Sequence, residues 1–235
     1  MKPDVQIDRI TNRFEIAVSN FGRSCIDMQA NEKAFQAWYA SCIVQEFGLS
    51  HVYREIHLWK SELFKLARPN ELTKNLRKGN ELFPDVSVSW SPNIDARHSS
   101  TRGNTLREAG AFLSEFSLIS ELKVTGSTSR PTPPRDVLND IAKLFVFSAA
   151  HRSFSKMHGN TLPLRCYMVV LDNAKDKDGN FKRSYSESKI NRLVDKARKS
   201  WEDGVPKPCV ILISPGQHAA RVSLLRDFRE WITLD

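Results

Sequence analysis

Residues 118–126 read LISELKVTG, and this stretch decides the fold because it puts two ionisable residues into an apolar strand. Side chains alternate between the two faces of a strand, so Glu121 and Lys123 share one face while Leu122 and Val124 share the other. The apolar run that leads into them is long enough for a central strand. The charged face therefore needs either solvent or a chemical site beside it.

An earlier strand carries a carboxylate of its own. Residues 81–90 read ELFPDVSVSW, and alternation places Asp85 on the polar face of that strand. If the two strands are neighbours, Asp85 meets Glu121 and Lys123. Two close carboxylates repel unless a cation lies between them, and oxygen ligands suit Mg²⁺ or Mn²⁺. A lysine beside the metal can position or help deprotonate a water and stabilise a phosphate, so the set predicts phosphodiester hydrolysis.

Pro84-Asp85 followed by Glu121-Leu122-Lys123 at the end of an apolar strand resembles the signature of the PD-(D/E)xK nuclease superfamily. The resemblance covers about residues 31–172, as helix, strand, strand with Asp, strand with Glu-x-Lys, helix and strand. It implies an α/β fold with a restriction-endonuclease-like mixed β-sheet core flanked by helices. We expect one nuclease domain over residues 1–235, in which residues 184–235 add a C-terminal strand and helix elaboration.

The same resemblance assigns roles to the site residues. Asp85, Glu121 and the backbone carbonyl of Leu122 would hold Mg²⁺, for which Mn²⁺ could substitute. Lys123 would serve the attacking water. These roles follow from the family signature and are expectations for this chain.

Two flanking helices are expected to contribute further groups. Family members often use a glutamate on their first helix as an extra ligand of the metal or as a partner of the metal ligands. Glu32 matches that position by order and by distance to the next strand, while Glu46 on the same helical stripe is its alternative. The helix after Glu-x-Lys often turns polar residues toward the site or the DNA. It carries Asp140 and Lys143 here, and the resemblance extends to Lys143 as a nucleic-acid contact.

The tripeptide Glu-x-Lys alone carries little information, since residues 187–189 are a second copy in a hydrophilic run. That copy lacks the strand, the upstream Pro-Asp and the downstream helix. The interval from Asp85 to Glu121 is long for the family and implies an inserted loop or a DNA-contacting hairpin. In the alternative interpretation Asp85 is a turn residue and Glu121 and Lys123 are a surface pair, contributing about 0 to 1 kcal/mol.

Periodicity and turn signals predict the remaining elements. We expect helices over residues 31–48, 136–154, 189–201 and 222–232, a strand over 51–59, a loop or short helix over 65–80, and buried strands over 164–173 and 208–216. The proline-rich stretch 126–135 is expected to be a loop.

Charge and composition bound the partners. The formal net charge of +8 implies attraction to polyanions, and DNA is the expected partner. Arginines near the proposed site in sequence are the expected phosphate contacts, namely Arg97, Arg102, Arg130 and Arg135. No apolar stretch approaches the roughly 20 residues that span a bilayer, so we expect no membrane partner. The four cysteines form no C-x-x-C pair, which argues against a zinc ribbon.

The expected function is that of a Mg²⁺-dependent endodeoxyribonuclease of restriction or defence type. A homodimer is expected because cutting both strands of a duplex favours two related sites. The N-terminal residues include acidic ones and no apolar run typical of a secretory signal, so we expect a cytoplasmic protein. Two alternatives stay open: a nuclease-like module that binds nucleic acid or protein without cutting, and an RNA-cleaving member of the same fold.

Overall fold

The computed structural model describes residues 3–25, 28–68, 70–77, 79–98, 106–126, 132–159, 162–201 and 204–214. Its helices are α1 (Pro3–Cys25), α2 (Glu32–Phe47), α3 (Lys60–Ala67), α4 (Ala109–Leu113), α5 (Pro134–His158) and α6 (Glu187–Arg198), with 3-10 turns at Leu49–His51 and Leu72–Arg77. Its strands are β1 (Val52–Arg54), β2 (Leu58–Trp59), β3 (Glu81–Leu82), β4 (Val86–Ser89), β5 (Phe116–Val124), β6 (Arg165–Leu171) and β7 (Cys209–Ile213).

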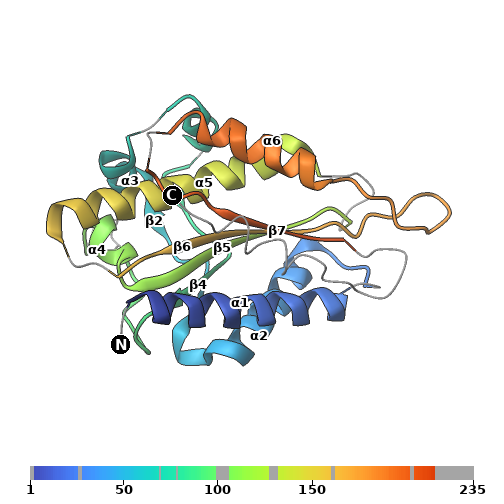
Figure 1. The fold of residues 1–235 in the computed structure, drawn as a ribbon, viewed down its shortest axis with the longest axis horizontal. Coiled ribbons are helices and arrows are strands. Elements are labelled where there is room, and N and C mark those ends of the chain that lie inside the picture. Colours follow the sequence, from blue (N-terminus) through green and yellow to red (C-terminus); the bar gives the residue numbers. More distant parts are fainter. Residues whose placement is uncertain are drawn as a thin grey trace.

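Five of these strands form one mixed sheet in the order β1-β4-β5-β6-β7. The pairs β1–β4 and β4–β5 are antiparallel, whereas β5–β6 and β6–β7 are parallel. Helices α1 and α2 cover one face of the sheet, and α5 and α6 cover the other (Figure 1). The expectation of an α/β fold with a mixed sheet flanked by helices is therefore confirmed at this level.

Two apolar clusters fill the space on either side of the sheet. One contains Phe35 and Tyr39 of α2 together with Leu122 of β5, and the other contains Phe145 of α5 with Met168 of β6. Because both faces of β5 and β6 are covered, both strands are buried along nearly their whole length. A charged residue in β5 is consequently enclosed by protein.

The two helices that flank β5 begin at residues suited to a helix start. Asn31 caps α2 by accepting a hydrogen bond from the backbone N–H of Ala34 at 2.9 Å, and this cap places Glu32 in the first turn. Pro134 lies in the first turn of α5, where its missing N–H costs nothing. The predictions of helices at 31–48 and 136–154 are confirmed, and α5 extends beyond the predicted range at both ends.

The prediction of a single strand over residues 51–59 is wrong. Its residues divide into β1, in the large sheet, and β2, which pairs with β3 in a separate two-stranded sheet. Between them Glu55 adopts a φ of +47°, in the left-handed region that interrupts an extended chain. Period-2 alternation alone gives no sign of this break.

Other predicted elements fare differently. The strands over 164–173 and 208–216 and the helix over 189–201 are confirmed as β6, β7 and α6, while the stretch 65–80 holds the end of α3 and a 3-10 turn. Helix α1 was not predicted. The helix expected over 222–232 lies outside the described residues, as do residues 127–131 of the proline-rich stretch, whose last two residues begin α5 instead of ending a loop. Among the helices that are described, none is long and apolar enough to cross a membrane.

Candidate functional site

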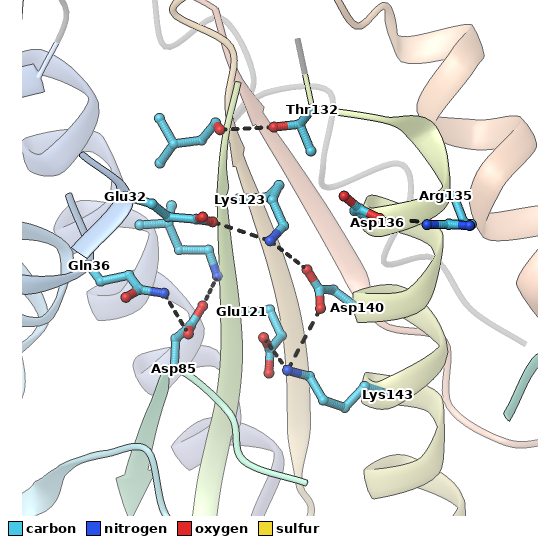
Figure 2. A network of polar contacts seen from close by, with 12 residues as sticks. Glu32, Gln36, Asp85, Glu121, Lys123, Thr132, Arg135, Asp136, Asp140 and Lys143 are labelled. Atoms are coloured by element: carbon cyan, nitrogen blue, oxygen red, sulfur yellow. Dashed lines mark hydrogen bonds and ion pairs between the residues drawn. The ribbon is translucent and has the colours of Figure 1, made fainter. Parts of the chain in front are cut away.

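The site lies where β4 begins and β5 continues past it. The register pairs Val86, the first residue of β4, with Ser120 of β5, so Asp85 comes to lie beside the next residues of β5. The backbone N–H of Leu122 donates to Asp85 Oδ2 at 2.7 Å, and the side-chain amide of Gln36 donates to Oδ1 at 3.0 Å. Both oxygens of Asp85 are thus oriented by groups from β5 and α2 (Figure 2).

The backbone carbonyl of Leu122 faces the same edge. A residue in a strand turns its N–H and its C=O to one side, and the N–H of Leu122 points to Asp85. β4 begins only at Val86, so the neighbour of β5 beside Leu122 is Asp85 and not a paired strand residue. The Leu122 carbonyl oxygen lies on this same side of β5. Asp85 and the Leu122 carbonyl therefore offer oxygen ligands from neighbouring positions.

Glu121 and Lys123 share the face of β5 that α5 covers, as alternation predicts. Glu121 Oε2 lies 2.7 Å from the ammonium of Lys143, while its Oε1 is buried with no hydrogen-bond partner within the described chain. Burial raises the pKa of Glu121 well above its usual range, and Asp85 adds to the shift while Lys143 opposes it. One carboxylate oxygen is therefore available to a ligand.

Lys123 is held between two helices. Its Nζ lies 3.2 Å from Glu32 Oε1 of α2 and 3.3 Å from Asp140 Oδ2 of α5. Burial by itself would lower the pKa of Lys123, but Asp140 and Glu32 outweigh it and raise the pKa above its usual range. Lys123 is therefore a fixed cation at neutral pH, suited to binding a water or a phosphate oxygen rather than to removing a proton.

Asp140 connects the two lysines of the network, and it is not among the site residues expected from the sequence. Its Oδ2 contacts Lys123 and its Oδ1 lies 3.7 Å from Lys143 Nζ (Figure 2). The spacing of three residues between Asp140 and Lys143 puts both on one helix face. That spacing, on the helix predicted to follow Glu-x-Lys, was the available signal.

Burial also raises the pKa of Asp85. This pKa rises from its usual 3.8 to about 6, while the Leu122 N–H and the Lys143 ammonium oppose the shift. When all groups are ionised, the network has a net charge of −2, because its two lysines face four carboxylates: Glu32, Asp85, Glu121 and Asp140. A divalent cation would balance that charge.

The residues present fit a Mg²⁺ ion by their chemistry. Asp85, Glu121 and the Leu122 carbonyl are oxygen ligands only, and Mg²⁺ completes such partial sets with water and substrate oxygens. The buried, unpartnered Oε1 of Glu121 is the observation that most favours a bound cation. Among the described side chains, no three His, Cys, Asp or Glu residues form a ready metal-binding group, and the expected set requires only two carboxylates.

The structure distinguishes the two candidate glutamates on α2. Glu32 contacts Lys123 directly. Glu46 is fourteen residues further along the same helix, which corresponds to roughly 21 Å at 1.5 Å per residue. Glu32 is therefore the helix residue that joins the network.

The expected nucleic-acid contacts are dispersed. Lys143 lies inside the network itself, Arg97 pairs with Asp95 at 2.8 Å in the segment after β4, and Arg135 lies 3.9 Å from Asp136 in the first turn of α5. Arg102 and Arg130 fall outside the described residues. Of the three that the structure describes, Lys143 is the one in contact with the predicted catalytic set.

In comparisons with known proteins, no family model, no curated protein and no solved structure matches this chain. Its function is accordingly inferred from the residues and their arrangement.

Proposed function

We propose that the chain is a Mg²⁺-dependent endodeoxyribonuclease of the PD-(D/E)xK type. The observation that carries this proposal is the meeting of Asp85 with Glu121, Leu122 and Lys123 at the place where β4 begins beside β5. The order α2, β1, β4, β5, α5, β6 supports a restriction-endonuclease-like core, since it is the element order that the family signature implies. The engagement of Lys123 by Glu32 supports the assignment of the helix glutamate.

Each residue has a distinct task in this proposal. Asp85, Glu121 and the Leu122 carbonyl would hold the Mg²⁺ ion, which when bound lowers the pKa of a water and neutralises phosphate charge. Lys123 stays protonated between Glu32 and Asp140 and binds a water or a non-bridging phosphate oxygen. Gln36 and the Leu122 N–H fix the orientation of Asp85. Hydrolysis then adds water to phosphorus and breaks one ester P–O bond.

The partners follow from charge and symmetry. The net charge of +8 favours a nucleic acid, whose phosphates dominate the affinity of basic proteins. A homodimer would place two sites on the two strands of a duplex. A role in restriction or defence, in the cytoplasm, rests on analogy with the family.

The test is nicking of supercoiled plasmid by the purified full chain with Mg²⁺, Mn²⁺ or EDTA. We expect cutting with either metal, none with EDTA, and none by Asp85→Ala or Lys123→Ala. Glu46→Ala is the matched control on α2 and should cut like the wild type. Metal-independent cutting, or full activity in Asp85→Ala, would overturn the site assignment.

One observation favours a second candidate, a nuclease-like module that binds nucleic acid without cutting. The ion pair between Lys143 and Glu121 gives that carboxylate a cation without any metal. Electrophoretic mobility shifts run beside the nicking assay separate the two, since a binding module retards DNA and leaves it intact. Single-stranded RNA in a parallel reaction tests the RNA-cleaving alternative.

A further inference from the structure

We propose that Lys143 is a resident counter-ion of the metal site, which neutralises Glu121 in the metal-free protein and leaves it when a divalent cation binds. The inference rests on the proposed function, because it concerns the same carboxylate. It adds a form of regulation: the protein's own ammonium group competes with the metal.

The geometry of the ion pair carries the first step. The distance between Lys143 Nζ and Glu121 Oε2 is 2.7 Å, and the two side chains are 14% and 3% exposed. A carboxylate that is so little exposed is costly to ionise alone, so a neighbouring cation stabilises it strongly. The ammonium of Lys143 provides that cation in the absence of metal.

The second step is the incompatibility of the two cations. A divalent ion bound to Glu121 beside Asp85 would lie within a few ångströms of the ammonium, at a distance where like charges repel strongly in a low-dielectric site. Binding of the metal therefore includes the cost of separating Lys143 from Glu121. The apparent affinity for the metal is lower than that of the same ligands without the lysine.

Lys143 also has two other acceptors, which it can keep after its contact with Glu121 is broken. Its Nζ lies 3.1 Å from the backbone oxygen of Phe83, which it contacts as a donor, and 3.7 Å from Asp140 Oδ1. An ammonium group has three donors, so a small rotation can keep these two partners. The side chain can withdraw without becoming unpaired.

Lys123 provides the internal contrast. Its partners are Glu32 and Asp140, neither of which belongs to the set of Asp85, Glu121 and the Leu122 carbonyl proposed to hold Mg²⁺. The two lysines thus divide their roles, since Lys123 is positioned for the substrate and Lys143 occupies the metal's carboxylate. Only Lys143 should respond directly to metal entry.

The test is Mn²⁺ binding to the full chain, measured by calorimetry and by electron paramagnetic resonance, for wild type and Lys143→Met. Removal of the competing charge should tighten Mn²⁺ binding by roughly tenfold or more, the scale of a single buried ion pair. In EDTA the variant should melt at a lower temperature than wild type, and Mn²⁺ should raise its melting temperature by more. The control is Lys65→Met, whose lysine pairs with Glu62 on the surface of α3 and should leave Mn²⁺ binding unchanged.

The outcomes separate this inference from the proposed function. If wild type binds Mn²⁺ and Lys143→Met binds it equally or more weakly, the counter-ion role is wrong while the metal site stands. If neither protein binds Mn²⁺, the proposed metal site itself fails. Should Lys143→Met not fold, lysine-selective NMR of wild type replaces it: Mg²⁺ should shift the Lys143 ammonium resonance far more than that of Lys123, and an unchanged Lys143 signal would refute the inference.

Discussion

Two buried carboxylates on adjacent strands of the sheet have opposite surroundings. Glu121 of β5 and Asp172, just after β6, are each 2% exposed. Asp172 accepts hydrogen bonds from Thr125 Oγ1 at 2.6 Å and from the backbone N–H groups of Ser184 and Tyr185 at 2.7 and 2.8 Å. Glu121 has a single ion-pair partner and one oxygen with none among the described groups.

The two carboxylates differ in how completely their oxygens are hydrogen-bonded. The three donors to Asp172 tie the end of β5 and the loop before α6 to the end of β6, so this carboxylate uses its hydrogen-bonding capacity for the fold. Glu121 has one buried oxygen without a hydrogen-bond partner among the described groups, which lowers the stability of the fold. Burial is equal in the two cases, and the completeness of the partners decides the role.

The largest effect that would sharpen this contrast is on activity. Glu121→Gln should lower metal-dependent plasmid nicking at least about 10³-fold, some 4 kcal/mol of transition-state stabilisation, because a neutral amide binds Mg²⁺ poorly. Its free energy of unfolding in EDTA should fall by less than about 3 kcal/mol, because an amide oxygen can still accept from Lys143, which also keeps the Phe83 carbonyl and Asp140 as partners. Initial nicking rates and urea titrations measure the two quantities. A wild-type nicking rate together with a larger loss of unfolding free energy would reverse the assignment.

Asp172 should respond in the opposite sense. Asp172→Ala leaves three donors without an acceptor, and we expect the free energy of unfolding to fall by about 3 kcal/mol. Asp172→Asn keeps one acceptor oxygen and should lose less. Urea denaturation followed by circular dichroism gives both values. A loss below about 1 kcal/mol in the alanine variant would mean that these bonds contribute little.

The burial of Asp85 should make the stability of the fold depend on pH. The folded protein holds the Asp85 proton more tightly than the unfolded chain, because its pKa rises from 3.8 to about 6 on folding. The free energy of unfolding in EDTA should therefore fall as pH rises through this window, by up to about 3 kcal/mol from this group. Subtracting the same curve for Asp85→Asn isolates it. A difference curve that is flat or rising between these pH values would contradict the shift.

The smallest effect tests whether the two carboxylates are independent. Thr125→Val removes one of the three donors to Asp172 and should cost about 1 kcal/mol of unfolding free energy. Mn²⁺ affinity and nicking should stay at wild-type values, because Thr125 touches none of the site residues in the described contacts. Calorimetry on the same preparation checks this, and a weakened metal site would show that the two ends of β5 and β6 are coupled.

Much of the site was predictable because it depends on local rules. Strand alternation put Glu121 and Lys123 on one face, and the apolar runs indicated the strands that bring Asp85 to them. The choice of Glu32 over Glu46 needed the direction in which α2 crosses the sheet. That direction depends on packing between distant segments, which a local pattern does not contain.

Three other features of the structure were not predicted from the sequence. Helix α1 packs its apolar face on α2 and the sheet, and it was missed although its apolar residues Phe14, Ala17, Val18 and Phe21 recur at helical spacing. The partners of Asp172 come from two other segments of the chain, the end of β5 and the loop before α6, so nothing in its own neighbourhood indicates them. The backbone break at Glu55 depends on a single residue in a left-handed conformation, which propensity favours only weakly outside glycine and asparagine.

The pairing of Val86 with Ser120 has a consequence for how such a protein can change over time. The register of β4 and β5 fixes the distance between Asp85 and Glu121, while the length of chain that joins them does not enter. The part of this segment that precedes α4 can therefore lengthen, shorten or be exchanged without moving the carboxylates, whereas α4 itself is fixed by its buried Phe112 and Leu113. It is a natural position for diversification, where new contacts can be acquired around an unaltered centre.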